Sequence, residues 1–298
     1  MIENLSASNS LARFESTVLE RLKDSNRFDD FIACKDAFDD LLLNGDLTNY
    51  LNSELSKSLG DPAYYPTAGP ERSLMIIDRP EYKAFLIFLS QIDIATSEQR
   101  RFIAGATGHQ MIGCISGSPI TFMKFRQPNP EPCEVFDRER GLIREADVVI
   151  AAGQTVVFEA SRDAFCPTKS DASLVLRLTT THLCHTRWDY DKRTGEPIRA
   201  VAASLVDSRV DFAVRTLGRV GNAASVPVLV NLCDHPAHFI RWSAIQALAM
   251  LAPDKAVSML ESARRDVHPH IREAAHRTLE SINLQETPSN GNYDRIQQ

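Results

Sequence analysis

The sequence predicts an α+β multidomain fold with N-terminal helices, an antiparallel β barrel or sandwich, and a C-terminal α-solenoid. Three observations support this prediction. Apolar residues recur at helical spacing near the N-terminus, short β-branched and aromatic runs fill the middle, and a repeat of about 31 residues follows. We therefore expect domains at 1–60, 70–200 and 203–283, followed by a flexible polar tail at 284–298.

Composition and charge are those of a globular protein. Apolar residues make up 43% of the 298 residues and charged residues 24%, with a formal charge of −6. Residues 1–60 contain 6 basic and 11 acidic side chains, unlike the clustered Lys and Arg that bind nucleic acid. The longest apolar-rich stretch, 84–95, is too short to span a membrane, and the N-terminus lacks a signal-peptide pattern. We expect a cytoplasmic protein with no nucleic-acid or membrane partner.

The six cysteines are scattered along the chain and form no CxxC pair. They stand at positions 34, 114, 133, 166, 184 and 233. In a cytoplasmic protein this pattern favours reduced, buried thiols, whereas a disulfide framework would need an oxidising compartment.

The N-terminal segment contains three apolar runs at helical spacing, which predict three amphipathic helices. Asn44-Gly45 separates the second run from the third, and Gly60 is placed to end the third helix. The runs are Leu11, Phe14, Val18 and Leu22; Phe28, Phe31, Ile32, Phe38, Leu41 and Leu42; and Leu47, Leu51, Leu55 and Leu59. Their acidic outer faces are expected to be solvated.

The middle region contains seven or eight short runs typical of strands, with turn residues but no helical pattern between them. In the run at 120–126, strict alternation places Lys124 on the same face as Phe122 and Arg126. Such a series predicts an antiparallel barrel or sandwich. The runs are RSLMIID, KAFLIFLSQIDI, GHQMIGCI, PITFMKFRQ, DVVIAA, QTVVFEAS and ASLVLRLTTTHL.

The C-terminal region repeats itself as helix–turn–helix units, which is the mark of a solenoid. The pattern beginning Ile240-Arg241 recurs about 31 residues later at Ile271-Arg272, and each is preceded by an Asp shortly before a His-Pro turn. The stretch 205–282 resembles HEAT repeats of the short phycobilisome-lyase type. The matching segments are FAVRTLGRVG, VPVLVNLCD, IRWSAIQAL and IREAAHRTL.

The HEAT resemblance implies structural contacts for the pairs Asp234/Arg241 and Asp266/Arg272. It also implies a scaffold or binding surface, because such repeats serve in unrelated settings. Trp242 is either an exposed binding anchor on this surface or a residue packed between repeats.

Two segments of the β region are similar to the motifs of cupins. HQMIGCISGSPITFMKF resembles the end of the first cupin motif, with Gly117 in the turn. ADVVIAAGQTVVFEASRDAFCPTKSDASLVLRLT resembles the second, with Gly153 at its opening glycine and Glu159 and Ser161 in place of the usual Pro and Gly. The resemblance implies a cupin-like barrel. In metal-dependent cupins, two His and an acid from the first motif and one His from the second bind the ion.

The metal ligands of that family are missing from the corresponding positions. The acid position falls on Gln110, the paired-His region on 104–106, and the last His position on Ala164. His109 is nearby but one residue out of register. We therefore expect a cupin-like barrel without a metal or cofactor.

Other His and Cys residues keep an enzymatic alternative open. A divergent cupin metalloenzyme, an iron-dependent oxygenase or an isomerase, would hold Fe or Zn through His109, His182 and His185. Cys184 and His185 also form a candidate nucleophile pair, although no third orienting group is evident. The chain has no GxGxxG, Walker, GxSxG or HExxH motif.

The turns of the repeats carry further histidines. His235 and His238, and His268 and His270, occupy equivalent turns of adjacent repeats and are expected along one edge of the solenoid. They fit a zinc site, a proton-sensitive patch, or simply polar turn residues.

The favoured hypothesis is a non-catalytic binding, regulatory or scaffold protein that recognises a protein, a peptide or a small-molecule ligand through the cupin-like barrel and the HEAT-like surface. No catalytic residue is assigned, and a homodimer is compatible with exposed strand edges. Candidate binding residues are His109, Lys124, Glu159, His182, Arg241 and Trp242.

Overall fold

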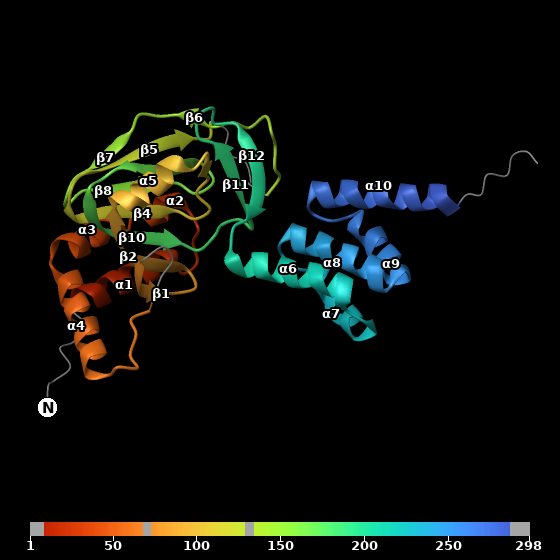
Figure 1. Ribbon diagram of the computed structural model, residues 1–298, viewed down its shortest axis with the longest axis horizontal. Coiled ribbons are helices and arrows are strands. Elements are labelled where there is room, and N and C mark those ends of the chain that lie inside the picture. Colours follow the sequence, from red (N-terminus) through yellow and green to blue (C-terminus); the bar gives the residue numbers. More distant parts are fainter. Residues whose placement is uncertain (1–8, 68–72, 129–133, 287–298) are drawn as a thin grey trace, which may run out of the picture. The chain divides into compact units, whose positions relative to one another are not determined.

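The computed structural model describes residues 9–67, 73–128 and 134–286. The chain divides into two compact units, residues 1–201 and 202–298 (Figure 1). In the described part of the chain, no helix has the length and apolar character needed to cross a membrane. The expected tail lies almost entirely outside the described residues.

Four helices, rather than the expected three, begin the first unit. They are α1 (Asn9–Leu22), α2 (Phe28–Ile32), α3 (Lys35–Leu43) and α4 (Asp46–Gly60). The second apolar run is split because the Cys34 N–H bonds back only three residues, to the Phe31 carbonyl at 3.1 Å, and this tight turn ends α2.

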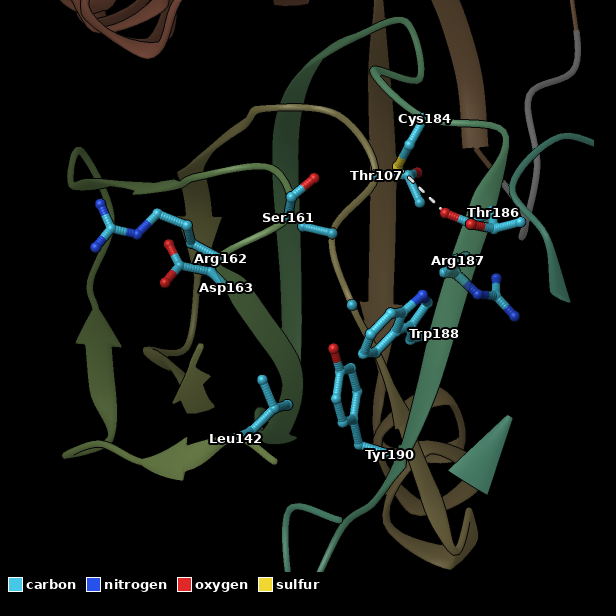
Figure 2. Close-up of a pocket in the computed structure, with 12 residues that line it drawn as sticks. Thr107, Leu142, Ser161, Arg162, Asp163, Cys184, Thr186, Arg187, Trp188 and Tyr190 are labelled. Atoms are coloured by element: carbon cyan, nitrogen blue, oxygen red, sulfur yellow. Dashed lines mark hydrogen bonds between the residues drawn. The ribbon is translucent and has the colours of Figure 1, made fainter. Parts of the chain in front are cut away.

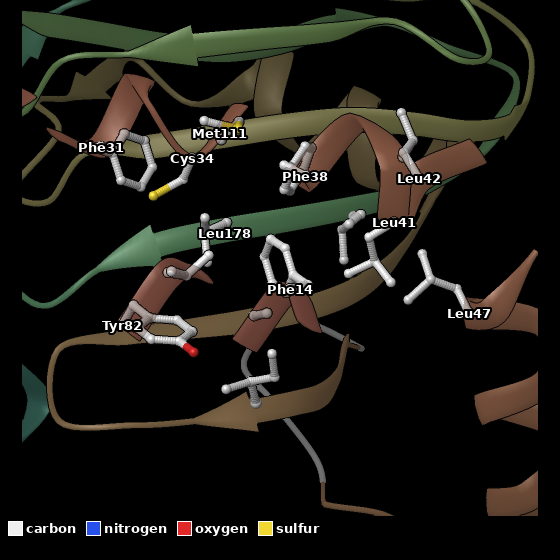
Figure 3. Close-up of a cluster of buried hydrophobic side chains, with 14 of the residues drawn as sticks. Phe14, Phe31, Cys34, Phe38, Leu41, Leu42, Leu47, Tyr82, Met111 and Leu178 are labelled. Atoms are coloured by element: carbon white, nitrogen blue, oxygen red, sulfur yellow. The ribbon is translucent and has the colours of Figure 1, made fainter. Parts of the chain in front are cut away.

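The apolar faces of these helices pack against a β-sheet of the same unit. Phe14 and Phe38 contact each other with ring centroids 6.3 Å apart and lie over Tyr82, Met111 and Leu178 of the sheet (Figure 3). Burial of these apolar side chains supplies most of the free energy that holds the helices on the sheet.

Gly113 on the sheet allows this packing to be close. A Cβ there would lie 2.9 Å from atoms of both Phe38 and Leu42, too close for either ring or methyl to stay in place. Glycine therefore lets α3 approach the sheet.

The sheet under the helices is antiparallel, in the order β1-β2-β10-β4-β8. Its strands are β1 (Ser73–Asp78), β2 (Tyr82–Ser90), β10 (Ala172–Thr180), β4 (Gln110–Gly117) and β8 (Thr155–Phe158).

A second layer is built around β5, which pairs with β6, β7 and β9. A bridge between Gly105 and Ala164 joins β9 to the end of β3, and β3 continues the layer through β11 and β12. These strands are β3 (Phe102–Ala104), β5 (Ile120–Arg126), β6 (Ile143–Arg144), β7 (Val148–Ile150), β9 (Asp163–Lys169), β11 (Thr186–Asp191) and β12 (Pro197–Ala202).

The two layers enclose an interior core of their own. Phe85, Ile112 and Phe158 from the first sheet meet Ile120 and Phe122 from the second. The strand order, β2-β10-β4-β8 facing β3-β9-β5-β7, is that of a double-sheet jelly roll, the architecture of cupins. Closure into a complete barrel stays a prediction.

The middle region departs from the expected all-strand pattern at α5 (Gln91–Gln99), whose first residues had been assigned to a strand. Ser90 accepts a hydrogen bond from the Asp93 N–H at 3.4 Å, and the Asp93 carboxylate accepts one from the Ser90 N–H at 3.0 Å. This reciprocal capping box starts the helix despite the apolar, β-branched residues that follow.

The second unit consists of helical repeats. Its elements are α6 (Leu205–Val220), the 3₁₀ turn η1 (Ala223–Ser225), α7 (Val226–Leu232), α8 (His238–Leu251), α9 (Pro253–Ala263) and α10 (Pro269–Glu286). One core cluster joins Val214 of α6 to Ala247 of α8, and a second joins Ile245 of α8 to Ala275 of α10. Each repeat therefore buries its apolar face against the next.

Candidate functional site

The interior of the jelly roll changes from apolar to charged along β5 and β9. In the pairing of these strands, Phe165 lies opposite Lys124 and Asp163 lies opposite Arg126. Residues paired in this way share one face of a sheet, here the face that Phe122 presents to the interior. The alternation expected from the sequence therefore holds for Lys124 and Arg126.

Asp163 is at the centre of the charged end and is only 3% exposed. One carboxylate oxygen accepts a hydrogen bond from the Glu159 N–H at 2.7 Å. The other lies 3.7 Å from Lys124 Nζ and 3.9 Å from Arg126 Nε. A buried carboxylate is stable only with such compensation.

The remaining charges of this end are also paired. Lys124 Nζ is 3.0 Å from the Glu145 carboxylate. Glu159 Oε2 accepts from Arg126 Nη2 at 3.1 Å and lies 3.4 Å from Arg162 Nη1. Cations and carboxylates alternate through the group, so it is close to electrically balanced.

The adjoining apolar interior is filled by aromatic rings. Phe158 and Phe165 stack with ring centroids 3.6 Å apart and an interplanar angle of 10°, and Phe122 meets both rings edge-on. Such packing leaves this part of the interior to side chains.

The inward position on β9 belongs to Asp163, not to Ala164, where the cupin alignment places the last His. Ala164 lies on the opposite face, in a cluster with Phe125 and Trp188. Asp163 was not among the predicted site residues, because a one-residue difference in register exchanges the two faces of a strand.

A metal ion of the cupin kind does not fit these residues. Among the described residues, no group of three or more His, Cys, Asp or Glu side chains is arranged to hold one. The Asp163 carboxylate, the sole inward acid on β9, already faces the cations of Lys124 and Arg126, which would repel a second cation.

His109, a candidate ligand, points away from the jelly-roll interior into the helix interface. Its ring contacts Phe28 and Phe31, with centroids 5.1 and 5.6 Å away. Nδ1 accepts a hydrogen bond from the Ala160 N–H at 3.0 Å, and Nε2 donates to the Asn26 carbonyl at 3.1 Å. Both ring nitrogens are occupied by backbone groups. Burial lowers the pKa of His109, against the opposing effects of the Asn26 carbonyl and the Glu159 charge.

His182 and His185 lie in the loop that joins β10 to β11. His182 is exposed, and its Nδ1 is 2.6 Å from Thr107 Oγ1. The His185 N–H donates to the Glu134 carboxylate at 2.5 Å. As binding or metal residues, both remain predictions.

Cys184, in the same loop, is disulfide-bonded. This corrects the expectation that all six cysteines are reduced. Cys34, Cys114, Cys166 and Cys233 are free thiols as expected, whereas Cys133 lies outside the described residues.

A small pocket lies beside the charged end of the jelly roll. Trp188 and Tyr190 of β11 border one side, and Ser161, Arg162 and Asp163 border the other (Figure 2). Its volume of about 20 Å³ is room for a single water molecule. Ser161 has φ 62°, the left-handed conformation for which the corresponding cupin position uses Gly.

Arg241 links two repeats through hydrogen bonds; we call this contact the latch. Its guanidinium donates two hydrogen bonds to the Asp266 carboxylate, at 2.8 and 2.6 Å, and Nη1 donates to the carbonyls of His235 and Pro236. Its predicted counterpart in its own turn, Asp234, is exposed. Arg241 therefore pairs with the following repeat.

Trp242 is half-buried and packs against a cluster that includes Ile245 and Ile271. Nearby, the rings of His238 and His268 stack, with centroids 3.7 Å apart and an angle of 7°. Parallel rings do not direct their nitrogens at a common ion, so this geometry does not support the zinc alternative.

Comparison with known proteins identifies residues 211–282 as HEAT repeats. No curated protein matches the chain. This match confirms the expected HEAT repeats, and the strand order described above agrees with the expected cupin-like β domain before them. The phycobilisome-lyase subtype stays a prediction.

Similar solved structures include three with low identity. Hydroquinone 1,2-dioxygenase PnpCD in complex with Cd²⁺ and 4-hydroxybenzonitrile is 9% identical, with a TM-score of 0.28 over 39% of this chain and 68% of that chain. FeII HppE in complex with substrate is 11% identical, with a TM-score of 0.26 over 40% and 59%. An uncharacterized double-stranded β-helix protein from Klebsiella pneumoniae is 7% identical, with a TM-score of 0.24 over 42% and 83%. These values are too low to transfer an activity.

Proposed function

We propose that the chain is a non-catalytic binding protein that recognises a protein or peptide partner through its HEAT repeats. The observation that supports this most strongly is the charged end of the jelly roll, where three cations and three carboxylates balance one another: Lys124, Arg126 and Arg162 against Glu145, Glu159 and Asp163. An inward position that serves metal chemistry in cupins is thus used for internal ion pairs. HEAT repeats supply extended surfaces for macromolecular partners.

The alternative, a divergent metalloenzyme with Fe or Zn, counts His109 among its candidate ligands, with His182 and His185. Both nitrogens of the His109 ring are engaged with backbone groups of Asn26 and Ala160. Coordination would break one of these bonds inside a buried interface, which costs about 1–3 kcal/mol for each unsatisfied group. A small-molecule ligand for the jelly roll, and a cytoplasmic location, remain predictions.

Metal analysis of the purified full chain tests the proposal. We expect no stoichiometric Fe, Zn or Mn after expression in metal-supplemented medium, and no change in the thermal midpoint on addition of EDTA. Stoichiometric metal that is lost on His109→Ala or His182→Ala, but kept in the matched variant His276→Ala, would establish the metalloenzyme instead.

A further inference from the structure

One face of helix α8 is covered by the preceding repeat helix, α6. Ser243 Oγ donates to the Asp211 carboxylate of α6 at 2.6 Å. Farther along, a Cβ on Gly218 of α6 would lie 3.0 Å from the Cα and Cβ of Ala247. The preceding helix therefore packs tightly on this face of α8 through small residues.

Within the second unit, no described helix covers the equivalent face of α6. A shift of 31 residues, as from Ala275 to Ala244, places Phe212 at the position of Ser243 and Thr216 at that of Ala247. Val220 takes the position of Leu251, whose Cδ1 would lie 3.1 Å from a Cβ on Gly221 at the end of α6. Phe212 is 73% exposed and Val220 is 75% exposed, and Leu205, two turns before Phe212 on the same face, is 65% exposed. Large apolar side chains grouped on one helix face mark an interaction site.

At the other end of the repeats, the outer face of the last helix, α10, is polar. Helix α8 contacts the next repeat through Trp242 and Ile245. The equivalent positions of α10, 31 residues later, hold Glu273 and His276. Glu273 forms an exposed ion pair with Arg277 at 2.9 Å. A polar outer face of this kind is the usual cap of a repeat array. The contrast singles out the apolar face of α6.

The charges beside this face indicate the chemistry of its partner. Arg209 lies one turn after Leu205, among the apolar side chains of this face, and Arg219 lies at its border. Neither forms an ion pair with another described residue, unlike Arg215, which pairs with Asp211. A second copy fits poorly, because two α6 helices packed antiparallel would bring Arg209 of one copy next to Arg219 of the other. Carboxylates are the complementary groups.

We propose that this surface, the α6 face, is the docking site for an amphipathic helix of a partner protein, with an aliphatic stripe flanked by Asp or Glu. The α6 face comprises Leu205, Arg209, Phe212, Arg219 and Val220. A helix fits because the equivalent face of α8 accepts one. The inference rests on the proposed function and specifies where the partner binds.

A labelled helical peptide of the length of α6 tests this with the full chain. The probe repeats the inner face of α6, with Val, Val, Leu and Gly at the spacing of Val210, Val214, Leu217 and Gly218, and carries Glu at its flanking positions. We expect saturable binding by fluorescence anisotropy. Phe212→Ser should weaken it by about tenfold or more, as for a central apolar anchor.

Charge reversal provides the specific readout. Arg209→Glu combined with Arg219→Glu should weaken the Glu-flanked peptide by about tenfold and should favour a Lys-flanked version of the same peptide. Leu284→Ser and Arg277→Glu, at the other end of the array, are matched controls expected to bind like wild type.

Three results would overturn the α6 face as a docking site. They are no binding by the wild-type chain, equal binding by the α6 variants and the controls, and a dimer in solution that Phe212→Ser converts to a monomer. Metal content tests the non-catalytic function independently, so either proposal can fail while the other stands.

Discussion

In the first unit, the positions of single polar side chains are explained by their hydrogen bonds and ion pairs. His109 and Lys124 illustrate this, since both were candidate binding residues and both are engaged within the unit. His109 bonds to two backbone groups, and Lys124 joins the carboxylates of Glu145 and Asp163.

Protonation of His109 should destabilise the fold. The ring is needed in its neutral form, since Nδ1 accepts a hydrogen bond, and burial lowers the pKa of His109 below its ordinary 6.5. Its contribution to stability is complete above the unfolded-state pKa and is lost as pH falls from that value through the folded-state pKa. Between these two pKa values, the unfolding free energy should fall more steeply with decreasing pH in the wild type than in His109→Gln. The difference between the two slopes is at most about 1.4 kcal/mol per pH unit, the value for one proton. Urea unfolding at pH 7.5, 6.5 and 5.5 measures the difference, and equal slopes would refute it.

Removal of the Lys124 charge should also destabilise the protein. Lys124→Met leaves the Asp163 carboxylate buried with only Arg126 near its second oxygen. The expected loss is about 3 kcal/mol of unfolding free energy. The double variant Lys124→Met/Asp163→Asn should recover most of it, and simple additivity in that cycle would contradict the ion pair.

Pairs of helices are joined by contacts specific to the repeat. The bidentate bond from Arg241 to Asp266 crosses from α8 to the turn before α10. Burial tends to raise the pKa of Asp266, but the bonds from Arg241 and from the His268 N–H outweigh it and lower the pKa below its ordinary 3.8. The latch therefore depends on an ionised carboxylate.

Loss of this latch should loosen the second unit. Arg241→Gln is expected to cost about 2–3 kcal/mol, because the half-buried Asp266 carboxylate then keeps only the hydrogen bond from the His268 N–H. Arg272→Gln, which removes only exposed bonds to the carbonyls of Asp266 and Val267, should cost about 1 kcal/mol and serves as the control.

The same contact has a defined pH dependence. Because the folded-state pKa of Asp266 is lowered, its stabilisation is present above pH 3.8 and is lost as pH falls through the folded-state value. Denaturant unfolding at pH 5 and pH 3 should show a steeper acid loss for wild type than for Arg241→Gln.

The molecule as a whole contains separate hydrophobic cores in its two compact units. The clusters around Phe14 and Phe122 share no buried residue with those around Val214 and Ile245. Destabilisation in one unit is therefore expected to remain there.

Hydrogen exchange read by mass spectrometry can check this separation. Lys124→Met should accelerate amide exchange in β5 and β9 and leave α8 and α10 near wild-type rates, with Arg241→Gln doing the reverse. Equal acceleration in both units by either variant would show a single cooperative structure instead.

The sequence by itself determined the order of the parts, because helical spacing, short strand runs and a repeat of about 31 residues are local patterns. It also located Lys124 on the face of Phe122. Only the tertiary structure decided that Asp163 points inward and His109 outward, since each depends on which strand or helix packs alongside. Pairing register and helix docking join residues far apart in the chain, and no local spacing encodes them.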